Sequence, residues 1–128
     1  MDQHDDHADL IHNFYVEQKE IFDHSDQGIY AFLDDDNRVC NDTFAKMLGY
    51  KSAKEWSSID VNESFPDTFI EERSQHALVE AFQNTMENCI SSTLDVTWKT
   101  KSGGSVDTTV VLIPIMFQEH LLALHFVS

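Results

Sequence analysis

Residues 90–128 leave the chain few folds to adopt, because they favour three consecutive β-strands. This stretch, ISSTLDVTWKTKSGGSVDTTVVLIPIMFQEHLLALHFVS, is rich in Thr, Val, Ile and Leu, which suit pleated strands. Ser-Gly-Gly-Ser at 102–105 is typical of a tight hairpin, and Gln-Glu-His supplies a second turn. Pro114 has no N–H to donate, so we expect a bulge or an unpaired amide there. The predicted antiparallel strands cover about 90–101, 105–117 and 121–127.

The earlier part of the chain favours helices, interrupted by one strand–turn–strand unit. Apolar residues recur at helical spacing from 8 to 22, whereas residues 1–7, rich in Asp and His, are predicted to be disordered. Residues 28–40 indicate two short strands around an acidic turn, and a longer helix is predicted over about 68–87. Helices and strands that do not alternate one by one predict an α+β fold with an antiparallel sheet. The N-terminal helix or a second subunit would cover the sheet face that the other helices leave bare.

The segment NDTFAKMLGYKSAKEW, which begins at Asn41, predicts two short helices directly after a strand. Asn41 is a good N-cap, because its side-chain oxygen can accept from a free amide of the first turn. Gly49 can adopt the left-handed conformation that ends a helix. Ser52 and Glu55 have the spacing of a capping box for the second helix, and Trp56 would be its apolar anchor.

Composition restricts the classes of partner. The 128 residues predict one domain. The net charge of −15, from 23 acidic and eight basic residues, argues against nucleic acid and against an anionic membrane surface. No apolar run could span a membrane and the N-terminus lacks the features of a signal peptide, so we expect a cytoplasmic chain without membrane contact. Cys40 and Cys89 lack the spacing of a zinc site and are predicted to be buried or half-buried free thiols.

The segment GIYAFLDDDNRVCNDTFAKMLGYKSAKEW resembles the N-terminal half of a PAS domain. The C-terminal sequences KTKSGGSVDTTVVLIPI and LLALHFVS resemble the hairpin and closing strand of that family, so the resemblance covers about residues 18–128. It implies an α+β PAS fold, with a five-stranded antiparallel sheet in the order 2-1-5-4-3, helices on one face and an N-terminal flanking helix. Residues 1–22 would form an acidic tail and that helix, and residues 23–128 the PAS domain. The residues that carry the structural motif are Asn41, Gly49, Tyr50 and Trp56.

The resemblance also implies a function. A PAS domain of this kind would be a sensory or interaction domain that binds a small ligand between the sheet and the helices and signals through homodimer contacts. Any catalytic effector, such as a two-component histidine kinase or a cyclic-dinucleotide enzyme, would lie outside this chain, which is not itself expected to be an enzyme. The candidate pocket residues are Val39, Met47, Leu48, Phe65, Ile70, Leu78, Phe82, Val111 and Leu124. The candidate dimer helix presents Leu10, Ile11, Phe14 and Tyr15.

The cofactor stays open at this point. FPDTFIEER, at the start of the predicted long helix, has no Cys where the flavin photosensors of the family carry one, so we do not expect flavin photochemistry. Haem-binding members use a His on that helix, which makes His76 a candidate haem ligand. However, Glu72 and Glu80 flank His76 at i−4 and i+4 and indicate a solvated face. His4 and His7, with His12, could bind metal only weakly, and we assign them no metal site.

Two other functions compete with a ligand-binding sensor. The first is a ligand-free dimerisation module, which would have the same core residues without an occupied pocket. The second is a small α+β enzyme of another fold, with a general base at Asp95 or Asp107. The order of the strands discriminates this enzyme from a PAS domain.

Overall fold

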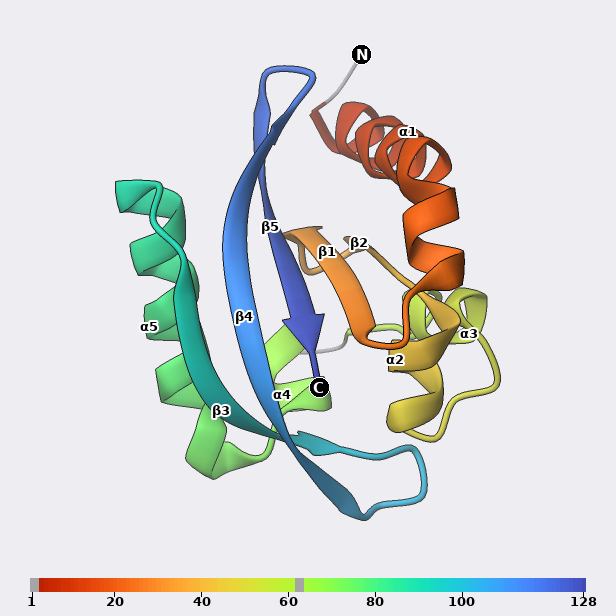
Figure 1. Cartoon of the computed structure of the whole chain (residues 1–128), viewed down its shortest axis with the longest axis vertical. Helices are drawn as coiled ribbons and strands as arrows, with labels where there is room; N and C mark the ends of the chain where they lie inside the picture. The colour runs from red at the N-terminus through yellow and green to blue at the C-terminus, as the bar shows by residue number, and fades with distance from the viewer. Residues whose placement is uncertain (1–2, 62–63) are drawn as a thin grey trace.

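A computed structural model describes residues 3–61 and 64–128 (Figure 1). The first half contains α1 (Gln3–His24), β1 (Gly28–Asp34), β2 (Asn37–Cys40), α2 (Asp42–Met47), α3 (Ala53–Ser57) and α4 (Phe65–Phe69). The second half contains α5 (Glu72–Asn88), β3 (Ser92–Lys99), β4 (Ser105–Phe117) and β5 (His120–Val127).

The strands form one five-stranded sheet in the order β2-β1-β5-β4-β3, and every neighbouring pair is antiparallel. This order confirms the predicted α+β PAS fold and argues against an enzyme of another α+β fold. The sheet is continuous because β5, at the end of the chain, inserts between β1 and β4. Figure 1 shows α1 on one side of the sheet and α5 on the other.

Strand register divides the core into two clusters, one on each face of the sheet. Tyr30 is paired with His125, and these residues share a face because side chains directly opposite in a ladder point the same way. Their neighbours along the strands, Ala31 and Leu124, point to the other face. The first face, with the helices α2 to α5, holds the larger cluster around Trp56. The second face holds a smaller cluster under α1.

The helix α1 supplies the cover for the second face. Its residues Leu10, Ile11, Phe14 and Phe22 are buried, and the ring of Phe14 packs edge-on against Phe117 at 5.3 Å between centroids. The helix begins at Gln3, so the predicted disorder of residues 1–7 is wrong for residues 3–7, while residues 1 and 2 lie outside the described part. Its first turns are held to the sheet, because the His7 ring nitrogen Nδ1 lies 2.7 Å from Asp34 Oδ2 in the β1–β2 turn.

The predicted caps of the two short helices are confirmed, although Glu55 Oε1 accepts from the Lys51 amide at 3.0 Å, where a capping box has it accept from the Ser52 amide. Asn41 Oδ1 accepts from the Phe44 amide at 2.9 Å and from the Ile29 amide at 3.0 Å, and Asn41 Nδ2 donates to the Gln27 carbonyl at 2.9 Å. One buried side chain thus joins the start of β1 to the start of α2. Gly49 has a φ of 87°, the left-handed conformation predicted for it. Ser52 Oγ accepts from the Glu55 amide at 3.2 Å and caps α3.

The long helix predicted over about 68–87 is two helices, α4 and α5. Ile70 is extended and forms an isolated bridge with Trp98, and the next amide, of Glu71, donates to the Thr97 carbonyl at 3.0 Å. This backbone pairing with β3 breaks the helix, and the helical spacing of apolar residues does not reveal it. The other boundaries agree with the predicted segments to within a few residues.

Pro114 lies in β4 opposite Ala123 of β5, and the register runs through it without a shift. No bulge occurs there, so that alternative is wrong. The pairing of β4 with β3 extends only to Leu112, opposite Ser92. Pro114 therefore lies beyond the end of β3, where a residue without an N–H causes no loss of ladder hydrogen bonds on that side.

The three hydrogen bonds of Asn41 make a testable contribution to stability. We expect Asn41→Ala to lower the free energy of unfolding by about 2 kcal/mol, because it removes a cap and leaves buried amides without partners. Ser52→Ala removes one half-buried cap and is the matched control, with an expected loss of about 1 kcal/mol. Urea denaturation followed by circular dichroism measures both. An Asn41→Ala loss no larger than that of Ser52→Ala would contradict the linking role of Asn41.

Candidate functional site

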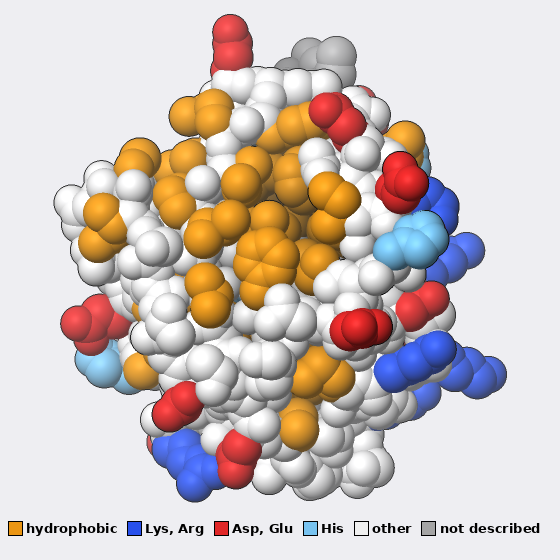
Figure 2. Space-filling view, in the orientation of Figure 1, with side chains coloured by type: hydrophobic (Ala, Val, Ile, Leu, Met, Phe, Trp, Pro, Cys, Tyr) orange, Lys and Arg blue, Asp and Glu red, His pale blue; other side chains and the backbone are white. Residues whose placement is uncertain are grey.

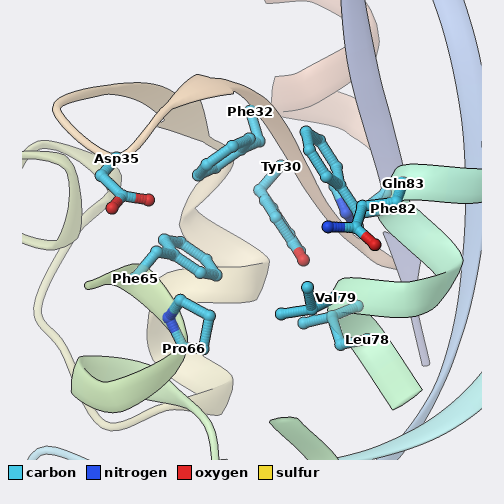
Figure 3. Close-up of a pocket in the computed structure, with 10 residues that line it drawn as sticks. Tyr30, Phe32, Asp35, Phe65, Pro66, Leu78, Val79, Phe82 and Gln83 are labelled. Carbon is cyan, nitrogen blue, oxygen red and sulfur yellow. The ribbon is translucent and has the colours of Figure 1, made fainter. Parts of the chain in front are cut away.

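A cavity of about 220 Å³ lies between the first face of the sheet and the helices α4 and α5 (Figure 3). The strands contribute an aromatic floor, and α5 contributes one wall. The lining residues are Tyr30, Phe32, Asp35, Phe65, Pro66, Leu78, Val79, Phe82, Gln83 and His125.

The base of the cavity is a stacked pair of polar aromatic residues. The rings of Tyr30 and His125 are nearly parallel, at 11°, with centroids 3.8 Å apart. Both residues are buried, since they lie opposite each other on the two central strands β1 and β5. Tyr30 Oη and His125 Nδ1 have no hydrogen-bond partner among the described residues. Figure 3 shows the Tyr30 hydroxyl directed into the space between Pro66 and Val79.

Burial sets the protonation of this pair. Desolvation raises the pKa of the Tyr30 hydroxyl well above its ordinary value, so the hydroxyl keeps its proton. Desolvation also lowers the pKa of His125 to about 3, so the imidazole is neutral at physiological pH. A neutral imidazole has one donor and one acceptor nitrogen. The two polar groups beneath the cavity are therefore both uncharged.

The walls of the cavity are aromatic and aliphatic. The ring of Phe32 meets those of Phe65 and Phe82 edge-on, each at 5.2 Å between centroids. Phe65 also lies over Tyr30 at 5.9 Å, with the two rings inclined by 25°. Leu78 completes the apolar wall from α5. These faces suit a flat apolar body.

Two polar residues, Asp35 and Gln83, lie among the lining residues outside the buried base. Asp35 is half-buried in the β1–β2 turn, and Gln83 is exposed on α5. Desolvation raises the pKa of Asp35, and the neighbouring carboxylates of Asp36 and Asp34 raise it further, against the lowering effect of a hydrogen bond from the Phe65 backbone. Among the described residues that line the cavity, none is Lys or Arg.

Arg38 fixes the turn that carries Asp35. Its guanidinium is buried and donates to three backbone carbonyls, at 2.8 Å to Asp35, 2.9 Å to Trp56 and 2.8 Å to Ile59. It also lies 4.9 Å from the ring centre of Trp56 and 5.0 Å from that of Phe69. The turn, α3 and α4 are thus tied together beside the cavity.

Three of the nine predicted pocket residues, Phe65, Leu78 and Phe82, line the cavity. Leu48 and Ile70, with the half-buried Met47, belong to the same core but lie outside its lining. The other three residues point to the opposite face, because side chains alternate along a strand. Val39 is paired with Ala31 on that face, and Leu124 and Val111 are the chain neighbours of His125 and Leu112, which point to the first face. These three are Val39, Val111 and Leu124.

Tyr30 and His125 were absent from the predicted pocket. Their signal in the sequence is the alternation of GIYAFLD and LLALHFV, which places every second residue on one face. That alternation alone does not tell which face the helices cover. The choice depends on where α1 packs, and this contact is not local in sequence.

The predicted motif residues Tyr50 and Trp56 pack in the core under the helices, and the predicted dimer residues lie on α1. Trp56 is fully buried in the helical core, and Tyr50 is half-buried against it. Of the predicted dimer residues, Leu10, Ile11 and Phe14 are buried against the chain's own sheet, and Tyr15 is half-buried. A dimer contact through these side chains stays a prediction, and other residues are more accessible to a partner.

The candidate cofactor and metal residues lie away from the cavity. The side chain of His76 is 92% exposed on α5, and its Nε2 lies 3.2 Å from Glu80 Oε2, as the flanking charges indicated. His7 contacts Asp34, His12 is exposed, and the side chain of His4 lies outside the described part. Within residues 3–61 and 64–128, no group of three or more His, Cys, Asp or Glu side chains could hold a metal ion.

Asp95 and Asp107 are exposed and do not line the cavity. Asp107 Oδ1 accepts from Thr97 Oγ1 at 2.7 Å and from Arg73 Nη2 at 3.1 Å. Asp95 accepts from Thr109 Oγ1 at 3.2 Å. These contacts occupy the carboxylates on an open surface.

The two cysteines are free in the structure, as predicted. Cys40 is buried, and desolvation raises the pKa of its thiol, so it is an unreactive core residue. Cys89 is exposed, so its predicted burial is wrong, and it ends α5 in the left-handed conformation, with a φ of 53°. In the described part of the chain, no helix is long and apolar enough to cross a membrane.

Comparison with known proteins identifies the family. A family model described as a PAS domain matches residues 17–84, more than half of the chain, and the protein therefore belongs to the PAS domain family. No curated protein matches the chain.

Solved structures share the fold at low identity. A PAS domain from a two-component sensor histidine kinase is 17% identical, with a TM-score of 0.65 over 91% of this chain and 95% of its own. The PAS domain of an HTR-like protein from Haloarcula marismortui is 15% identical, with a TM-score of 0.61 over 92% and 93%. The Vibrio cholerae VqmA dimer is 12% identical, with a TM-score of 0.64 over 88% of this chain and 50% of that one. At such identities the likeness shows the fold alone.

The neutral state of His125 predicts a pH-dependent stability. The folded chain keeps this imidazole neutral down to about pH 3, whereas the unfolded chain takes up a proton below about pH 6.5. Since the unfolded state binds more protons in this window, the free energy of unfolding falls as the pH is lowered, by up to roughly 1.4 kcal/mol per pH unit from this group. His125→Phe keeps a ring on Tyr30 and removes the titration.

Urea denaturation of wild type and His125→Phe at about pH 7 and about pH 5 checks this prediction. We expect the stability of the wild type, relative to that of the variant, to fall between the two pH values. Because the other titrating groups are the same in both proteins, their effects cancel in the difference. A difference that does not change with pH would show that His125 is not held neutral in the fold.

Proposed function

We propose that this PAS domain is a sensory module that binds a small molecule in the cavity between the sheet and the helices α4 and α5. The observation that carries the proposal is the cavity itself: Phe32, Phe65 and Phe82 line a space of about 220 Å³ that the side chains of the core leave open, and Asp35 and Gln83 lie among the other lining residues. Protein cores are close-packed and contain few voids larger than a water molecule. A core without an occupant would fill such a space with its own side chains.

The short elements around the cavity support a sensory role. The helix α4 has five residues, and α3 beyond it also has five. Helices of this length are not stable alone and depend on their packing. An occupant that contacts Phe65 and Pro66 therefore acts on a segment that can rearrange at low cost in free energy.

We further propose that the domain forms a homodimer through the second face of the sheet. Figure 2 shows apolar side chains gathered over β4 and β5 beside α1. Ile113 and Phe126 lie half-buried on this face, and Val16 and Ile21 of α1 are 56% and 60% exposed. A similar structure, VqmA of Vibrio cholerae, is described as a dimer. A dimer would bury the apolar surface that α1 does not cover.

The two proposals connect through the sheet. His125 lines the cavity on one face, and its neighbours Leu124 and Phe126 lie on the other. A displacement of β5 by a ligand would therefore reach the proposed dimer surface. An effector in the parent protein, such as a histidine kinase in the cytoplasm, would receive the change. A similar solved PAS domain comes from a sensor histidine kinase.

Ligand binding can be tested with a variant that blocks the cavity. Val79 is 36% exposed and lines the cavity from α5, so Val79→Trp places a large ring there. We expect small neutral aromatic fragments to shift the amide resonances of β1 and α5 in the wild type and not in Val79→Trp. Ile90→Trp is the matched control, because Ile90 is also exposed and does not line the cavity. Equal shifts in all three proteins would place the binding elsewhere.

Dimerisation can be tested by introducing charge on the second face. We expect Ile113→Glu to convert a dimer into a monomer in light scattering, because an uncompensated carboxylate in an apolar interface costs several kcal/mol. Ile90→Glu, on an exposed residue between α5 and β3, should leave the mass unchanged. A folded Ile113→Glu variant with the mass of the wild type would show that this face is not the interface.

A further inference from the structure

We propose that His7 and His120 bind a divalent transition-metal ion of the zinc type, which fastens the start of α1 to the β4–β5 hairpin. The sequence groups His7 with His4 and His12, a set to which we assign no metal site. The fold instead brings His7 to a histidine near the other end of the chain. This site is separate from the cavity and does not depend on the proposed ligand-binding function.

The two imidazole rings meet where α1, β1 and β5 come together. Their centroids are 5.6 Å apart, and the rings lie edge-on at 88°. His120 begins β5 directly after the β4–β5 turn, and Figure 1 shows the start of α1 beside that turn. Two imidazoles that share a tetrahedral Zn²⁺ ion, with Zn–N distances of about 2.0–2.1 Å, have centroids roughly 5 Å apart. The rings therefore lie close to the separation that a shared ion requires.

Hydrogen bonds to oxygen determine which nitrogen of each ring is left for a metal. His7 Nδ1 lies 2.7 Å from Asp34 Oδ2, and His120 Nδ1 lies 3.1 Å from the Gln118 carbonyl oxygen. A carboxylate and a carbonyl only accept, so Nδ1 carries the proton in the neutral form of each imidazole. The lone pair is then on Nε2 of both rings. Metal-binding histidines are held in the same way, with the other ring N–H donated to a carboxylate or a backbone carbonyl.

Access and charge favour a cation at this place. The side chains of His7 and Asp34 are 19% and 37% exposed, and His120 is half-buried, so an ion can enter from solvent. The net charge of −15 raises the concentration of cations near the surface. Imidazole nitrogen suits Zn²⁺, Cu²⁺ and Ni²⁺, whereas Mg²⁺ and Ca²⁺ prefer oxygen ligands. The ion is therefore of the first kind.

The two imidazoles supply only part of a ligand set. Asp34 is an outer partner of His7, and within residues 3–61 and 64–128 no three His, Cys, Asp or Glu side chains form a group that could hold an ion. Water would therefore fill the remaining positions around the metal. We expect reversible binding, weaker than at a structural site with four protein ligands, so the fastening of α1 follows the concentration of the ion.

The affinity for Zn²⁺ tests the two ligands. It is measured on the full chain by competition with a chromogenic zinc chelator at about pH 7.5, where an ordinary imidazole is neutral. We expect His7→Ala and His120→Ala each to weaken binding at least about tenfold, since losing a ligand costs no less than losing its outer partner. His12→Ala and His76→Ala are the matched controls, because both histidines are exposed, and they should leave the affinity unchanged. Mg²⁺ should compete at least about tenfold more weakly than Zn²⁺.

A variant of Asp34 tests the outer partner. Asp34 Oδ1 accepts from the Asp36 and Asn37 amides at 3.0 and 2.9 Å, so Asp34→Asn keeps an oxygen for the turn and presents an NH₂ group to His7. His7 Nδ1 must then accept, which moves the ring proton to Nε2 and removes the lone pair. We expect a loss of about tenfold in Zn²⁺ affinity. A merely structural contact would lower stability and leave this affinity unchanged.

Amide hydrogen exchange tests the fastening of α1. Leu10 and Ile11 follow His7 on this helix and are buried against the sheet. We expect Zn²⁺ to slow the exchange of their amides in the wild type and not in His120→Ala, because the ion joins α1 to β5 only when both ligands are present.

Three results would overturn the site. Wild-type affinity for Zn²⁺ in the double variant His7→Ala, His120→Ala would place the ion elsewhere on the chain. Equal affinities for Mg²⁺ and Zn²⁺ would show an adventitious ion only, attracted by the net charge. No competition with the chelator would show that the two rings do not share an ion. Each of these results leaves the proposed binding of a small molecule in the cavity unaffected.

Discussion

The strand β5 pairs with β1 on one side and with β4 on the other, and the rest of the molecule depends on this double pairing. It brings the last strand of the chain next to the first and closes the sheet around a central ladder. Its register places Tyr30 opposite His125 and so decides which side chains meet the helices. A slip of one residue would exchange the two faces, moving the apolar cover of α1 to the wrong side. The apolar residues on both faces therefore hold the register that forms the cavity.

Around this ladder, the protein buries two kinds of polar atom, those with a hydrogen-bond partner among the described residues and those without one. The indole nitrogen of Trp98 donates to Thr108 at 2.9 Å, and Asn41 uses its amide group in three hydrogen bonds. Those buried polar groups stabilise the structure. Tyr30 Oη and His125 Nδ1 have no such partner among the described residues, although both residues are buried. The contrast favours a functional reason for their presence, because function often requires groups that lower stability.

Much of the fold could be predicted from local signals. Asn41 and Gly49 begin and end α2 as their chemistry dictates, and the Ser-Gly-Gly-Ser turn separates β3 from β4. The strand order came from a family resemblance and is confirmed. The break between α4 and α5 could not be predicted, because Ile70 leaves the helix to pair with Trp98, a residue far away in the sequence. Long-range pairing overrides helical periodicity there.

The candidate site was harder to predict than the fold for a related reason. Phe65, Leu78 and Phe82 were found because apolar residues on helices that cover a sheet point toward it. Val39, Val111 and Leu124 have the same apolar character, but the alternation of strands directs them to the second face. Tyr30 and His125 are polar, so the apolar pattern that predicts lining residues does not include them. Their place beneath the cavity follows from the pairing of β1 with β5, which is not local in the sequence.

A crystal structure of the wild-type protein, purified without additives and refined at a resolution that shows ordered waters, tests the central claim most directly. The account predicts a small molecule in the cavity, in contact with Phe65 and Pro66 of α4. A cavity filled by the chain's own side chains, with the Tyr30 hydroxyl donating to a protein carbonyl, would contradict it. The domain would then be a dimerisation module whose core is complete without a ligand.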